Sequence, residues 1–313
     1  MFNGQVLIGN VKEASLGTIT IDEMDLKLLT IKLYKIRRLR IVHHFKIETV
    51  DKKLYYGLIN PTDKDGWVEI ETGYGKVAMP ITNIFSLISL DKNFFRRLNG
   101  NVSAGLSYAK SSNIGQVNFS ALLQFATRLL DNQLTASELG SIDSGRYSRD
   151  NESLQLFSAY QLNTSWFVTV VGQYQRNLEL TIARRLMGIG GIGNKVVVRD
   201  NWSLFAVTGF AFSQERSTAG VNSGLLIEIP FMLRFNLFQF RKPDLQINST
   251  QTAYFGLTEA GRFRADGNTS ASWQLIRDFY LSLSPYTNFD SNPPSASSSK
   301  FDYGVVFSLT YKF

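Results

Sequence analysis

The chain has 313 residues, no cysteine and a formal net charge of +7. Without cysteine there can be no disulfide, thiol nucleophile or Cys-ligated metal site. The positive charge is spread along the chain rather than gathered in one basic stripe, so it does not indicate a nucleic-acid-binding protein.

Residues 1–95 are predicted to form a small β domain built from two repeats. Segment 7–41 matches segment 55–89 at an offset of 48 or 49 residues. Each copy reads as three or four short strands with Gly-bearing turns, and one copy alone would bury too little surface. The matched pairs are Gly9 with Gly57, Gly17 with Gly66, Ile19 with Val68, Ile21 with Ile70 and Ile36 with Ile84.

The first nine residues, MFNGQVLIG, have no features of a signal peptide. Because an exported protein needs a signal peptide, we expect one upstream of this sequence.

Two features of this first domain could carry chemistry. His43 and His44 are the only histidines, and on a strand adjacent side chains point to opposite faces. That arrangement is poor for a metal site or a catalytic dyad, so we expect surface histidines, no metal and no cofactor. The basic run KLYKIRRLR (32–40) favours a solvated strand edge. The alternative is docking to anionic headgroups of the inner leaflet, or to a periplasmic partner.

From residue 96 onward the chain alternates apolar and polar residues with period two. The odd positions of 301–313 are Phe, Tyr, Val, Phe, Leu, Tyr and Phe, and those of 225–237 are all apolar as well. Such alternation in segments of about ten residues or more is typical of a transmembrane β-barrel. We therefore predict an all-β protein, with a barrel of about twelve antiparallel strands over 96–313. The strand segments are 100–110, 115–128, 131–139, 152–163, 166–176, 178–197, 202–213, 222–238, 244–255, 265–275, 278–290 and 301–313.

The lengths of the connections give the predicted barrel an orientation. An even strand number places both ends in the periplasm, where bacterial barrels have short turns. The even-numbered connections, such as 162–165 and 198–201, are short, whereas 140–151 and 291–300 are long and polar. Aromatic residues, among them Trp166 and Trp202, lie near the presumed inner rim. The competing interpretation is a soluble β-sandwich or lipocalin-like barrel, in which the apolar face would point inward.

The charged residues Glu179, Arg185, Glu228 and Arg234 fall on the predicted lumen face, although a bulge could exchange Arg185 for Arg184. Charges facing lipid would cost about 2–4 kcal/mol each for Arg or Lys at mid-depth. Inside the barrel they can pair across the lumen or select solutes. The motif GIGGIG (188–193) satisfies G-x-G-x-x-G, but the strand-like NKVVV follows it instead of a helix. We therefore expect a bend, a bulge or room for a bulky neighbour rather than a nucleotide site.

Several segments resemble those of the YdiY-like family of salt-induced outer-membrane proteins, a family of unknown function. They are LELTIARRLMGIGGIG (178–193), SLFAVTGFAFSQER (203–216), TEAGRFRAD (258–266) and the C-terminal FDYGVVFSLTYKF (301–313). The resemblance covers about 98–313. It implies a barrel in the outer membrane of a Gram-negative bacterium and gives no catalytic residue.

On this basis we expect the partners to be outer-membrane lipid and the barrel-assembly machinery, with no nucleic acid. Leu309, Tyr311 and Phe313 are the expected C-terminal assembly signature. The predicted role is non-enzymatic: envelope structure or passive solute passage. The alternative is a membrane-anchored interaction protein whose first domain or outer loops bind a partner.

Overall fold

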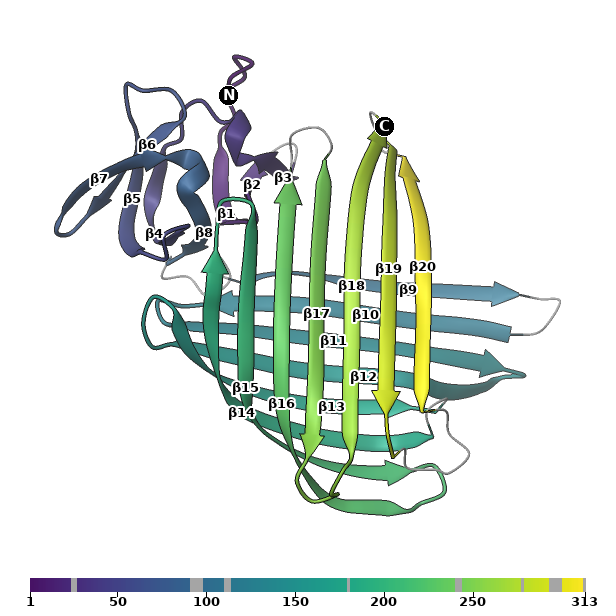
Figure 1. The fold of residues 1–313 in the computed structure, drawn as a ribbon. Helices are drawn as coiled ribbons and strands as arrows, with labels where there is room; N and C mark the ends of the chain where they lie inside the picture. The colour runs from purple at the N-terminus through teal and green to yellow at the C-terminus, as the bar shows by residue number, and fades with distance from the viewer. Residues whose placement is uncertain are drawn as a thin grey trace.

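The computed structural model contains two β-sheets and no α-helix among the residues it describes (Figure 1). Described are residues 1–23, 27–90, 98–109, 114–178, 181–239, 244–276, 279–292 and 300–311. The first sheet has eight strands within Gly9–Ser89, and the second has twelve strands within Leu98–Tyr311. No helix formed by these residues is long and apolar enough to cross a membrane.

The first sheet has an internally symmetric strand order, β3-β2-β1-β8-β4-β5-β6-β7. Exchanging the strands β1–β4 with β5–β8 reverses this order and leaves it otherwise unchanged. Strands β4 and β8 therefore cross over, so that each half contributes its last strand to the middle of the sheet. The strands are β1 (Gly9–Ser15), β2 (Thr18–Glu23), β3 (Lys27–Lys32), β4 (Ile41–Thr49), β5 (Leu54–Pro61), β6 (Trp67–Thr72), β7 (Gly75–Pro80) and β8 (Ile84–Ser89).

One hydrophobic core holds the first sheet together. Single 3₁₀ turns, η1 (Leu33–Lys35) and η2 (Ile81–Asn83), precede the last strand of each half and bury Leu33 and Ile81. Complete burial of one such side chain stabilises the fold by about 1.5–3 kcal/mol. All buried members of this core lie between Ala14 and Leu87, so the second sheet contributes none of them. Its fully buried members include Ile19, Phe45, Ile47, Ile59, Val68, Ile70, Ile84 and Leu87.

The second sheet is an up-and-down meander in which every strand pairs with its neighbours in sequence. The predicted number of strands is confirmed, and most boundaries fall within three residues of the prediction. The strands are β9 (Leu98–Ala109), β10 (Ile114–Ala126), β11 (Leu130–Asp143), β12 (Arg146–Gln161), β13 (Trp166–Asn177), β14 (Ile182–Val198), β15 (Trp202–Ser217), β16 (Asn222–Gln239), β17 (Leu245–Gly256), β18 (Phe263–Ile276), β19 (Phe279–Asp290) and β20 (Phe301–Tyr311).

The two faces of the second sheet differ in polarity and in exposure. Phe307, Leu309 and Phe231 are 71%, 66% and 45% exposed. Polar residues on the opposite face are buried, including Thr169, Ser203, Ser213, Glu228 and Asn236. A soluble β-sandwich has the reverse arrangement, because its apolar face forms the core. We call the two surfaces the apolar face and the polar face.

The closed barrel expected from the sequence is not formed within the described residues. No pairing joins β9 to β20, so both remain sheet edges. In Figure 1 the sheet folds back on itself, and β9–β13 run across behind β16–β20 at a steep angle. Because the first and last strands cross at this angle, the two edges do not lie alongside each other.

The glycine motif 188–193 lies inside strand β14 and is not followed by a helix. A Cβ atom at Gly193 would lie 2.2 Å from the Phe167 ring, so this glycine makes room for an aromatic side chain. Bulges flank the motif, at Ile182/Arg184 and Lys195/Val197, rather than interrupting it. The expectation of a bulky neighbour is met at Gly193.

The predicted loop 140–151 was wrong. Strand β11 continues to Asp143, and β12 begins at Arg146 after a two-residue turn in which Ser144 and Gly145 both have positive φ. A bulge between Leu139 and Gly140 shifts the register by one residue in this hairpin. The tip of this hairpin extends past the end of β13 and is level with the β9–β10 hairpin, because Ile114 pairs with Asp143.

Candidate functional site

The predicted lumen residues Arg185, Glu228 and Arg234 all lie on the polar face. The register aligns Arg185 with Glu215, Ala211 with Glu228, and Arg234 with Thr250. Glu179 lies outside the described residues, as does Phe313. At the C-terminus, Leu309 is exposed on the apolar face, and Tyr311 ends β20.

Arg185 pairs across neighbouring strands with Glu215. Its Nε donates to Glu215 Oε1 at 2.8 Å, and its Nη1 donates to Gln175 Oε1 at 3.1 Å. Glu215 is 4% exposed, and its second oxygen, Oε2, is buried with no hydrogen-bond partner in the structure. An unsatisfied carboxylate oxygen in a buried place is costly, so this group is poised to accept a further donor.

Glu228 forms a two-point ion pair with Arg264 across the intervening strand β17. Nε and Nη2 of Arg264 donate to the two carboxylate oxygens, the first at 2.8 Å. The guanidinium also lies 4.6 Å from the centre of the Tyr254 ring. Glu228 and Arg264 are 2% and 6% exposed. Such a bidentate, buried pair fixes the position of three adjacent strands relative to one another.

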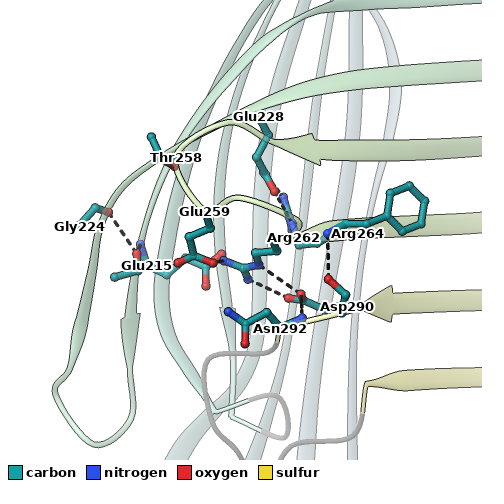
Figure 2. A network of polar contacts seen from close by, with 12 residues as sticks. Glu215, Gly224, Glu228, Thr258, Glu259, Arg262, Arg264, Asp290 and Asn292 are labelled. Atoms are coloured by element: carbon teal, nitrogen blue, oxygen red, sulfur yellow. Dashed lines mark hydrogen bonds and ion pairs between the residues drawn. The ribbon is translucent and has the colours of Figure 1, made fainter.

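Arg262, in the turn before β18, ties together two acidic residues. It donates to both oxygens of Asp290, at 3.1 and 2.7 Å, and to Glu259 at 3.2 Å (Figure 2). Burial alone would lower the pKa of the Arg262 guanidinium, but the hydrogen bonds to Asp290 together with the negative charges of Asp290 and Glu215 outweigh burial and raise the pKa above its usual value. Arg262 is therefore a permanent positive charge.

These pairs gather at the end of the polar face that carries the odd-numbered connections. Glu215, Glu259, Arg262 and Asn292 surround a hollow of about 290 Å³, and Figure 2 shows their charged groups pointing toward one another. Carboxylates outnumber guanidinium groups in this cluster, which we call the charged cluster. An ion or polar solute passing here would meet a field of net negative charge. Its members are Arg185, Glu215, Glu228, Glu259, Arg262, Arg264, Asp266 and Asp290.

The sequence analysis named Arg185 and Glu228 but missed their partners and several other members of the cluster. Glu215, Arg262 and Arg264 fell in predicted outer loops, because β15 and β18 extend further than the alternation suggests. The segment GRFRAD contained a usable signal: Arg262, Arg264 and Asp266 alternate with apolar residues. That spacing places all three on one face of a strand.

A second group of polar contacts joins the first sheet to the end of the second sheet that carries the short turns. Lys195 Nζ donates to Glu48 Oε1 at 2.6 Å, and both side chains are at least nine-tenths buried. Lys52 donates to the main-chain carbonyls of Lys195 and Val196, which lie at the bulge in β14. A bulge leaves backbone groups without ladder partners, and here Lys52 satisfies them.

Other turns at the same end also contact the first sheet. Lys46 lies 3.6 Å from Asp131, the Arg128 guanidinium lies 4.1 Å from the centre of the Tyr56 ring, and Lys32 pairs with Asp244. Arg128 and Asp244 belong to the turns after β10 and β16, and Asp131 is the second residue of β11. Lys195 and Val196 precede the turn after β14. The first sheet therefore rests on three short turns of the second sheet.

His43 and His44 are adjacent and exposed in β4. Within the part of the chain that the structure describes, no group of three or more His, Asp or Glu side chains is arranged to hold a metal ion.

Comparison with known proteins assigns the second sheet to a family. The family described as "Protein of unknown function, DUF481" matches residues 101–313, which is most of the chain. The match includes the whole twelve-stranded sheet except the first residues of β9. The chain belongs to the DUF481 family. This agrees with the resemblance to the YdiY-like family found in the sequence. No curated protein matches this DUF481 chain.

Among solved structures, this DUF481 protein is similar to a "Bacterial polysaccharide outer membrane secretin" at 9% sequence identity. The match covers 89% of this chain and 100% of that chain, with a TM-score of 0.38.

Proposed function

We propose that the second sheet closes into a twelve-stranded barrel in the outer membrane and allows passive passage of small polar solutes. The observation that carries this proposal is the contrast between the exposed apolar face and the buried polar face. In lipid every backbone group must be paired, so β9 and β20 would have to join. Both edges present large apolar side chains on the same face, among them Val102, Leu106, Phe307 and Leu309.

In this proposal the short turns and the first sheet lie in the periplasm, and the charged cluster lies toward the outside. The connections after β17 and β19 are longer than the turns at the other end of the sheet, which supports that orientation. The protein would not be an enzyme: both of its histidines lie in the first sheet, away from the charged cluster. It would depend on outer-membrane lipid and on the barrel-assembly machinery for insertion.

Conductance in planar lipid bilayers tests solute passage. We expect discrete ion-conducting steps with a preference for cations, because carboxylates outnumber guanidinium groups in the charged cluster. Replacing Arg234, which is exposed on the polar face, with alanine should raise the cation-to-anion permeability ratio about tenfold, because loss of the positive charge favours cations and disfavours anions by the same amount. A unit charge roughly 6 Å from an ion in a water-like lumen contributes about 0.7 kcal/mol.

The matched control is Arg216→Ala, which removes the same charge from the apolar face and should leave the ratio unchanged. If Arg234→Ala leaves both current and ion preference at the wild-type values, Arg234 has no role in selectivity.

A second candidate function is that of a membrane-anchored interaction protein. The outer strand β7 of the first sheet has a free edge within the described residues, and a free edge can accept a strand from a partner. Absence of conductance from a correctly inserted protein would favour this function over solute passage.

A further inference from the structure

The apolar face carries a groove across β11–β16 that the proposed passage function does not use. Its volume is about 650 Å³, which is within the range of ligand sites, roughly 300–1,000 Å³. Its lining includes Leu156, Tyr174, Leu186 and Phe212. The groove is therefore suited to a flexible hydrocarbon chain.

Glycines form the floor of the groove. Gly172 and Gly188 lie directly opposite each other on β13 and β14, and a Cβ atom at either position would meet nothing within 4 Å. These glycines are thus not required by close packing, in contrast to Gly193 beneath Phe167. Their effect is to leave space on the side that faces lipid.

Beside the groove, on the same face, lie three arginines that form no ion pair with a carboxylate of the described residues, although Arg176 is directly opposite Glu152 on β12. Arg176 donates only to main-chain carbonyls, those of Arg149 and Ala183, at 3.0 and 3.3 Å. Arg184 and Arg216 are exposed. Arg176 lies two residues beyond Tyr174 and Arg184 two residues before Leu186, so both are about 7 Å from the groove along their strands.

Arg184 and Arg216 are directly opposite each other on β14 and β15. Like charges in such a cross-strand pair repel and destabilise a sheet. Two carboxylates on the same face are already engaged: Glu152 accepts from Tyr174 Oη at 2.9 Å and from Arg149 at 3.2 Å, and Glu138 accepts from Tyr147. An anion between Arg184 and Arg216 would relieve the repulsion.

We propose that this groove and these arginines form a binding site for one lipid with a phosphate-monoester headgroup. The acyl chain lies in the groove over Gly172 and Gly188, and the phosphate accepts hydrogen bonds from Arg176, Arg184 and Arg216. Guanidinium groups suit phosphate because of their planar, two-pronged geometry. This inference rests on the proposed membrane position of the apolar face, and the arginines lie toward the outer leaflet in that arrangement.

Native mass spectrometry of the detergent-purified protein tests the site. The probes are dipalmitoyl phosphatidic acid and dipalmitoyl phosphatidylcholine, which have the same acyl chains. We expect the protein to retain one bound phosphatidic acid molecule, with an affinity about tenfold higher than for phosphatidylcholine. That factor corresponds to the loss of one charge-assisted hydrogen bond when the phosphate monoester is replaced. The double variant Arg184→Gln/Arg216→Gln should lose this preference, and Gly188→Leu should reduce retention of both lipids by filling the groove.

The control Arg37→Gln/Arg38→Gln removes two positive charges from the segment between η1 and β4, far from the groove in sequence, and should bind like the wild type. Equal retention of both lipids by the wild type, or an unchanged preference in Arg184→Gln/Arg216→Gln, overturns the proposal. Heat-modifiable migration on a gel is recorded for each sample. A shifted, folded protein without lipid preference refutes the lipid site alone, whereas an unshifted protein refutes the barrel and the lipid site together.

Discussion

Replacing Arg264 with methionine should destabilise the protein by about 3–5 kcal/mol, because the substitution leaves the Glu228 carboxylate buried without its partner. Glu228 is 2% exposed and makes two hydrogen bonds to Arg264. The measurement is the free energy of unfolding in urea, with the protein in detergent micelles.

Removing both charges should restore most of the loss. In Glu228→Leu/Arg264→Met no charge remains buried at this place, and replacing a buried ion pair with apolar residues is often close to neutral. The control is Lys53→Met, which breaks an exposed pair with Asp51 and should cost less than about 1 kcal/mol. A value for Arg264→Met within that range would show that the Glu228–Arg264 pair is not structural.

Replacing Lys195 with methionine should release the first sheet from the short turns of the second. The substitution leaves Glu48 buried and unpaired, which costs about 3–5 kcal/mol at an interface made of few contacts. Hydrogen exchange of the backbone amides in 127–131 and 196–201 should accelerate on the order of a hundredfold. Exchange within the core strands of the first sheet should stay slow, because their core is closed without the second sheet.

The double variant Glu48→Leu/Lys195→Met should return exchange in 127–131 toward the wild-type rate. Lys76→Met, which breaks an exposed pair with Glu69 in the first sheet, should change nothing in these turns. Unaltered protection in Lys195→Met would mean that Lys32, Lys46, Lys52 and Arg128 hold the first sheet by themselves.

The strands of the second sheet could be predicted from the sequence because alternation is a local property. For 166–176 and 301–313 the pattern of apolar and polar residues decides which side chains share a face, whatever the rest of the chain does. The hairpin around Ser144 was missed because its strands are polar on both sides, so alternation gives no signal there.

The ion pairs could not be predicted in the same way. Arg185 and Glu215 are 30 residues apart in sequence, and Glu228 and Arg264 are 36 apart. The first contact depends on the register of one strand pair, and the second on the register of two successive pairs. The contact of Glu48 with Lys195 requires the bulge at Lys195/Val197, for which the sequence carries no clear mark. Contacts between residues far apart in sequence can be predicted only when the strand ends and the bulges are known.

Thiol labelling tests most directly whether the apolar face meets lipid and the polar face encloses water. The chain has no cysteine, so single cysteines can be placed at Phe231, Met232, Leu233 and Arg234 in turn on strand β16. In protein inserted into vesicles, we expect a water-soluble maleimide to label Met232→Cys and Arg234→Cys and to spare Phe231→Cys and Leu233→Cys. Labelling of positions 231 and 233 with protection of 232 and 234 would contradict the account.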